Sequence, residues 1–255
     1  MGFKDQMALM AAPIFLRLAL SITFLWAGSG KLTQFFEVSG ADAAYLANMN
    51  AIDLSQLAGA GGGGAAQSGS TPFLPPLAQN TAPTVRIFFA SDFPTPVKAR
   101  SMYRISLLLR NAAEPGNDDS GATKMRLWPT ALAQGQWTRG LAITVAWTEA
   151  IGGFLVFVGL FTRLWSFLLA GTMMGAMWLT LIGPTMQSGK TRLGFLPADP
   201  SLFDVAAWTP WLFVFGTLMS CLALMCAGAG AWSLDAALAP AKSSPKPAAP
   251  KPAAP

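Results

Sequence analysis

The sequence predicts an all-α membrane protein: a bundle of four transmembrane helices with a long, mostly irregular insertion between the first helix and the second. Of its 255 residues, 53% are hydrophobic and only 11% are charged, whereas a soluble domain usually carries about a quarter charged residues. Four nearly charge-free stretches are each long enough to cross a hydrocarbon core of roughly 30 Å as a helix. They are residues 11–27, 141–161, 164–182 and 208–229.

Residues 1–32 are expected to form the N-terminus and the first transmembrane helix. The apolar run contains Arg17, and no small-x-small cleavage site follows it. These two features distinguish it from a secretory signal peptide, which has an uncharged apolar region ending at such a site. We therefore expect this first helix to remain uncleaved.

Residues 33–138 form a predicted extramembrane insertion whose composition changes repeatedly. A weak helix is predicted over residues 41–57, a glycine-rich linker over 59–70, and a proline-rich stretch over 71–96 that flanks a short strand at 85–89. So much glycine and proline argues against a continuous core.

The most regular part of the insertion is an amphipathic helix predicted over residues 99–113. Apolar residues recur there at helical spacing: Met102, Ile105, Leu108, Leu109 and Ala112. Such a basic helix next to membrane spans either lies in the lipid interface or caps the mouth of the bundle. Both placements are compatible with the sequence.

Residues 139–238 are expected to hold the second, third and fourth transmembrane helices with their connecting loops. Only Thr162 and Arg163 separate the second and third apolar stretches, so these two helices should form an antiparallel hairpin. Residues 239–255 consist mainly of Ala, Pro and Lys, a composition typical of a disordered, solvated tail.

Composition excludes several kinds of chemistry. Histidine is absent, which removes His-ligated haem, His-ligated zinc and His general-base catalysis. Cys221 and Cys226 are five residues apart on one predicted helix, so they fit neither a disulfide nor a CxxC centre. We expect no metal site. We also expect no nucleic-acid partner, because three of the lysines behind the net charge of +5 lie in the last 14 residues.

Three charged residues in or beside the apolar spans are the candidate site: Arg17, Lys31 and Glu149. A charge at the centre of a bilayer costs about 2.5 to 3.5 kcal/mol on insertion scales, so each should have a partner or water. Arg17 and Lys31 lie near one face of the first helix, and we expect Glu149 to pair with one or both. Such an intramembrane polar centre either locks the bundle as a buried ion pair or handles a proton or a substrate group.

Three separated motifs make the chain resemble the DoxX-like family of four-helix membrane proteins. They are Arg17-Leu18 through Gly28-Ser29-Gly30-Lys31-Leu32, Glu149-Ala150-Ile151-Gly152-Gly153 through Gly159-Leu160-Phe161-Thr162-Arg163, and Gly230-Ala231-Trp232-Ser233-Leu234-Asp235. The long insertion and the Ala-Pro-Lys tail depart from the usual family pattern.

The resemblance implies a four-helix membrane bundle, and some relatives are subunits of sulfur-linked or quinone-linked oxidoreductases. It therefore suggests a small subunit of a membrane complex with quinone-linked redox chemistry, and the lipid bilayer and other subunits as its partners. No cofactor is evident from the residues themselves, and a quinone is the one that the resemblance suggests. The alternative is a non-enzymatic structural or assembly subunit. No substrate is indicated, and both an enzymatic and a non-enzymatic role stay open.

The charges beside the spans predict the orientation. Four spans place both termini on one side, with Lys4, Arg163, Lys242, Lys246 and Lys251. The short loop on the opposite side carries Lys190 and Arg192. The positive-inside rule then favours cytoplasmic termini, and we expect a multi-pass protein of a bacterial inner membrane.

Overall fold

The computed structural model describes residues 3–53, 87–117, 121–201, 203–230 and 232–238 and confirms the predicted all-α membrane protein. Four helices are long and apolar enough to cross a membrane. They are α1 (Phe3–Thr33), α5 (Gln136–Val158), α6 (Thr162–Met177) continued through the π-helical η4 (Trp178–Ile182) and α7 (Gly183–Gln187), and α8 (Val205–Ala227). The glycine-rich linker, most of the proline-rich stretch and the tail at 239–255 lie outside the described residues.

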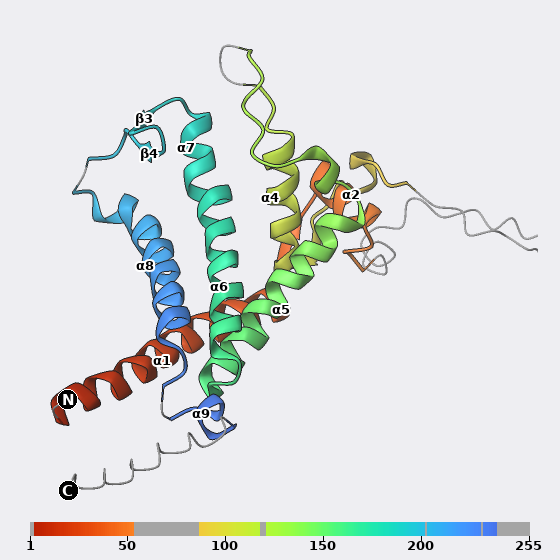
Figure 1. Cartoon of the computed structure of the whole chain (residues 1–255). Helices are drawn as coiled ribbons and strands as arrows, with labels where there is room; N and C mark the ends of the chain where they lie inside the picture. Colours follow the sequence, from red (N-terminus) through yellow and green to blue (C-terminus); the bar gives the residue numbers. More distant parts are fainter. Residues whose placement is uncertain (1–2, 54–86, 118–120, 202, 231, 239–255) are drawn as a thin grey trace, which may run out of the picture.

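The four helices pack as two pairs joined by a tight turn. α1 packs along α5 and α6 packs along α8, while α5 and α6 form the predicted hairpin. Figure 1 shows the beginning of α1 and the short helix α9 (Leu234–Leu238) at one end of the bundle. The insertion lies at the other end, as does the loop holding β3 (Thr191–Arg192) and β4 (Leu196–Pro197).

The turn between α5 and α6 comes earlier in the chain than predicted. It is formed by residues 159–161, and Thr162 already begins α6. Gly159 has φ +74°, in the left-handed region that favours glycine, and its N–H donates to the Leu155 carbonyl at 2.9 Å. Phe161 is also left-handed, at φ 49°. A glycine therefore ends α5 inside the run that was read as one span.

The described part of the insertion is more regular than its composition suggests. It contains β1 (Phe35–Val38), α2 (Gly40–Asn48), η1 (Ala90–Asp92), β2 (Val97–Arg100), η2 (Ser101–Tyr103), α4 (Arg104–Ala113) and η3 (Thr130–Leu132). β1 and β2 pair antiparallel. The expected strand is not formed at its described residues 87–89, and the helix expected over 41–57 ends at Asn48.

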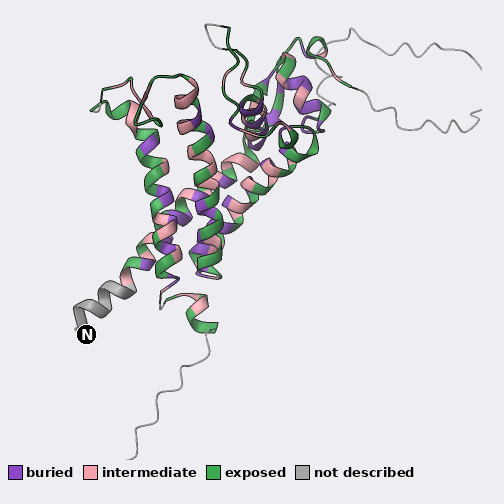
Figure 2. Ribbon diagram, turned by 45° about the horizontal axis from the view of Figure 1, so that its top comes forward, coloured by how far each residue is buried: buried purple, intermediate pink, exposed green. Residues whose placement is uncertain are grey.

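The expectation that the insertion lacks a continuous core was wrong for these residues. Leu46, Met49 and Phe93 are each at most 1% exposed, and they belong to one cluster with Ala142 and Ala146 of α5. The buried residues run through both the insertion and the bundle in Figure 2. The core was missed because its two halves are far apart in sequence and α5 completes it.

The amphipathic helix predicted over 99–113 begins only at Arg104, because residues 99 and 100 belong to β2. Its apolar face is buried against protein. Leu109 and Ala112 pack with Leu127 and with Leu179 of η4. The Trp178 indole N–H also donates to the Leu127 carbonyl at 3.1 Å. The insertion thus packs directly on the end of the third span.

Candidate functional site

Two glycines allow α1 and α5 to cross with their backbones in contact. A Cβ on Gly28 would lie 2.5 Å from the Ala150 nitrogen, and one on Gly153 would lie 2.9 Å from the Leu25 nitrogen. Small residues at such crossings are typical of membrane helices, because they let backbones approach closely. Lys31 follows Gly28 by about one turn, so the crossing carries it toward Glu149.

Lys31 and Glu149 form an ion pair beside this crossing. The Lys31 ammonium donates to both carboxylate oxygens of Glu149. Glu149 is 1% exposed, whereas the Lys31 side chain is 30% exposed. Ala146, about one turn from Glu149 on α5, and Phe24, about two turns from Lys31 on α1, are also buried. The pair therefore joins a carboxylate inside the protein to a cation that reaches its surface.

The ion pair leaves hydrogen-bonding capacity unused. An ammonium group has three N–H donors, and a carboxylate can accept about four hydrogen bonds. Within the described part of the chain, Lys31 uses two donors and Glu149 accepts only those two bonds. One N–H of Lys31 and part of the acceptor capacity of Glu149 thus remain available to a further group.

Arg17 does not join this pair, which corrects the prediction of a single polar centre. Arg17 and Lys31 are 14 residues apart on one helix, about 21 Å along its axis. The Arg17 guanidinium instead donates to four backbone carbonyls. These are Val156 (3.0 Å, from Nε), Phe157 (2.6 Å, from Nη2), and Ala229 and Trp232 (3.1 Å and 2.7 Å, from Nη1).

The Arg17 bonds tie the last turn of α5 to the chain that follows α8. The last carbonyls of a helix have no partner within the helix, and Val156 and Phe157 find theirs in Arg17. Gly159 is required beside the guanidinium, because a Cβ there would lie 2.6 Å from Arg17 Nη2. We call this arrangement, formed by Arg17 and its four carbonyl partners, the arginine clamp.

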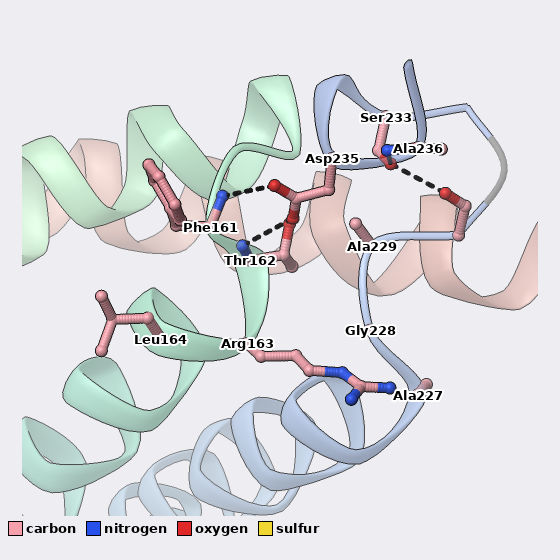
Figure 3. A pocket seen from close by; sticks show the side chains of 11 residues that line it. Phe161, Thr162, Arg163, Leu164, Ala227, Gly228, Ala229, Ser233, Asp235 and Ala236 are labelled. Atoms are coloured by element: carbon pink, nitrogen blue, oxygen red, sulfur yellow. Dashed lines mark hydrogen bonds between the residues drawn. The ribbon is translucent and has the colours of Figure 1, made fainter. Parts of the chain in front are cut away.

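Asp235 completes the same turn from the other side, a role that the sequence analysis missed. Its carboxylate accepts from the Phe161 N–H at 2.7 Å and from the Thr162 N–H at 3.0 Å, as Figure 3 shows. An acidic group at this position satisfies free N–H groups and complements the helix dipole at the beginning of α6. The Asp235 N–H also donates to the Gly159 carbonyl at 2.9 Å. The available signal was the acidic residue that ends the third family motif.

The structure therefore separates the three predicted residues into two places. Lys31 and Glu149 meet near the insertion, whereas Arg17 lies at the opposite end with the α5–α6 turn and α9. Arg17 is 7% exposed and each of its nitrogens is already engaged. Of the three predicted residues, Lys31 and Glu149 are the two that combine a buried ion pair with unused donors and acceptors.

Comparison with known proteins gives one match. The family model described as DoxX matches residues 120–181, a segment that includes Glu149, the α5–α6 turn and α6. The match supports the resemblance, and it covers the second of the three motifs, from Glu149 to Arg163. No curated protein and no solved structure matches the chain.

Proposed function

We propose that this chain, a membrane protein of the DoxX family, is a small subunit of a membrane complex and that Lys31 and Glu149 form its site for a quinone. The observation that carries the proposal is the buried Glu149 carboxylate held by a partly exposed Lys31 ammonium. A buried carboxylate beside a single cation is an arrangement often found where protons or ligands are handled inside a membrane.

The unused donors and acceptors fit a quinone. When bound, a quinone supplies two-electron, two-proton redox chemistry. The remaining N–H of Lys31 would donate to a carbonyl oxygen of the ring, and Glu149 would hold or release a proton at its carboxylate. Lys31 reaches the protein surface, so protons can exchange there while Glu149 stays in an apolar setting.

The bundle exposes large apolar faces, which can contact lipid or further subunits of a complex. Only 28–33% of the most apolar window of each candidate span is buried. Large apolar side chains point outward, including Phe154 (55% exposed) on α5 and Leu212 (65%) and Phe213 (59%) on α8. Lipid or other subunits must cover these faces.

A structural or assembly subunit is the second candidate. The insertion favours it, because its described residues form a buried core continuous with α5 and pack against η4. A rigid extension of this kind can hold a larger partner without any chemistry. The Lys31–Glu149 pair would then act only as a lock between α1 and α5.

We also propose a bacterial inner membrane location with both termini in the cytoplasm. The beginning of α1 and α9 lie at the same end of the bundle as the α5–α6 turn (Figure 1), where the sequence places Arg163. Accessibility of a cysteine introduced near either terminus in right-side-out vesicles measures this orientation directly. Labelling of such a cysteine from outside contradicts it.

The Glu149→Gln variant tests the quinone site against the lock. Gln keeps the shape of the side chain but not its charge. If the pair is the quinone site, the variant should therefore lose bound quinone at an unchanged melting temperature. Removal of one partner from a buried ion pair that serves as a lock typically costs about 3 to 5 kcal/mol, so melting then falls sharply. Both quantities are measured on full-length protein purified in mild detergent, by mass spectrometry of extracted quinone and by thermal unfolding.

A matched control separates the pair from a general effect of charge. Glu114 is exposed on the insertion, so Glu114→Gln makes the same chemical change away from the pair. We expect it to retain quinone and stability. Wild-type protein that carries no quinone, together with early melting of Glu149→Gln alone, contradicts the quinone site and supports the structural subunit.

A further inference from the structure

A hollow of about 610 Å³ lies at the end of the bundle that carries α9. Figure 3 shows it between the beginning of α6 and the chain that follows α8. Its walls come from residues 161–164 at the α5–α6 turn and the beginning of α6, from residues 227–230 at and after the end of α8, and from Ser233, Asp235 and Ala236. Two segments that are more than 60 residues apart in sequence therefore build it.

Arg163 supplies an unpaired positive charge in this hollow. Its side chain is exposed, and within the described residues its guanidinium makes no hydrogen bond and no ion pair. It extends past Gly228 in Figure 3. A Cβ on Gly228 would lie 3.1 Å from Arg163 Nε, and Gly228 has φ +80°. The glycine thus leaves space for a guanidinium whose donors remain free.

Thr162 supplies a second unused polar group. It also lines the hollow, it is fully buried, and its Oγ1 has no hydrogen-bond partner within the described part of the chain. A buried hydroxyl without a partner is costly and usually indicates water or a ligand. Arg163 and Thr162 both line the hollow, so one ligand in it can contact both side chains.

The charge around the hollow favours an anion. Asp235 is its one acidic lining residue among those described, and both of its carboxylate oxygens already accept N–H bonds from Phe161 and Thr162. Arg163 and the nearby Arg17, which donates to the Trp232 carbonyl, carry two positive charges. The local balance is therefore one net positive charge.

The position of the hollow at the end of the spans favours one class of anion. α6 begins at Thr162 and α8 ends at Ala227, and both are ends of candidate membrane spans. Lipid phosphates lie at this level of a bilayer. On the rim, Phe161 and Leu164 are 63% and 54% exposed, which provides an apolar surface for acyl chains.

We propose that this hollow binds the headgroup of an anionic phospholipid, with Arg163 holding the phosphate and Thr162 donating to it. Arginine matches phosphate oxygens with two parallel N–H bonds, and such charge-assisted bonds are stronger than neutral ones. The inference is independent of the quinone proposal, because it concerns the opposite end of the bundle.

Native mass spectrometry of the full-length chain with added phosphatidylglycerol tests the site. Hydrogen bonds to charged groups contribute about 1.5 to 3 kcal/mol, so Arg163→Gln should weaken binding at least about tenfold. Arg192→Gln is the matched control, because it removes the same charge from β3 at the other end of the bundle. It should leave binding unchanged. Thr162→Val keeps the charge and the shape and should weaken binding to a smaller extent.

Three outcomes overturn the proposal. The first is equal loss of phosphatidylglycerol in Arg163→Gln and Arg192→Gln, which indicates attraction by net charge alone. The second is displacement of the lipid by millimolar inorganic phosphate, which indicates a site for a soluble anion. The third outcome applies if Arg163→Gln does not fold. Thr162→Val that binds phosphatidylglycerol as tightly as wild type then contradicts the proposed hydrogen bond from Thr162 to the phosphate.

Discussion

The arginine clamp predicts that Arg17→Lys destabilises the protein although it conserves the charge. Arg17 reaches four carbonyls with three nitrogens that point in different directions. Lysine places its three donors on one nitrogen and is a point charge on a flexible stem. It therefore leaves at least two of the four carbonyls without a protein partner.

The size of the effect follows from these bonds. Each hydrogen bond from a charged donor contributes about 1.5 to 3 kcal/mol, so two lost bonds correspond to about 3 to 6 kcal/mol. Water can reach carbonyls near the end of the bundle and offsets part of this loss, which favours the lower figure of about 3 kcal/mol. For a chain of this size that corresponds to a fall in melting temperature of about 6 to 12 °C.

Thermal unfolding in detergent at a fixed scan rate measures the shift. Arg192→Gln serves as the control, because the exposed Arg192 side chain makes no hydrogen bond and no ion pair within the described residues. Its melting temperature should stay within about 2 °C of wild type. Arg17→Lys protein that melts as late as this control refutes the view that the four carbonyl bonds, more than the charge, hold the α5–α6 turn to the chain after α8.

Two further predictions concern the helix crossing and the insertion. Gly28→Ala should destabilise the protein by about 1 to 3 kcal/mol, because the added Cβ would meet the backbone of Ala150. Gly171→Ala is the control and should not destabilise it, because nothing lies within 4 Å of its added Cβ. Equal melting temperatures of the two variants contradict the close crossing of α1 and α5. Burial raises the pKa of Tyr45 above its usual 10.0, so the folded state favours the neutral phenol. The stabilisation that this shift gives the folded state is complete below pH 10 and is lost as the pH rises through the folded pKa. Tyr45→Phe should not lose stability in this way at alkaline pH. Urea unfolding measures the difference in free energy of unfolding between wild type and Tyr45→Phe, and a difference that stays constant above pH 10 contradicts the pKa shift.

The transmembrane helices could be predicted from sequence because their signal is local. A run of apolar residues long enough for a bilayer is visible without knowledge of its neighbours. The ends of the helices were less predictable: Gly159 ends α5 in a left-handed conformation inside an unbroken apolar run. The core of the insertion was not predictable, because β1 pairs with β2 some 60 residues later and Ala142 of α5 completes the cluster.

The candidate site shows the same division between local and distant information. Glu149 and Lys31 stand out in the sequence as charges beside apolar runs, and the structure brings them together. Grouping Arg17 with them assumed that the depth of each residue in its own helix decides which charges meet. Its actual partners are backbone carbonyls, and those of Ala229 and Trp232 come from a loop more than 200 residues away. Every residue carries a backbone carbonyl, so the sequence does not show which carbonyl will accept a hydrogen bond from Arg17.

The charged groups at the two ends of the bundle differ in how fully hydrogen bonds satisfy them. A buried cation that is satisfied by four fixed carbonyls gains nothing from a further ligand, so the arginine clamp is best explained by stability. A buried carboxylate paired with a partly exposed lysine can exchange that partner for a ligand or a proton, since the long Lys31 side chain can turn toward solvent without unfolding a helix. Chemistry in this protein should therefore depend on Glu149 and Lys31, and variants of Arg17 should lose activity only in proportion to lost folded protein.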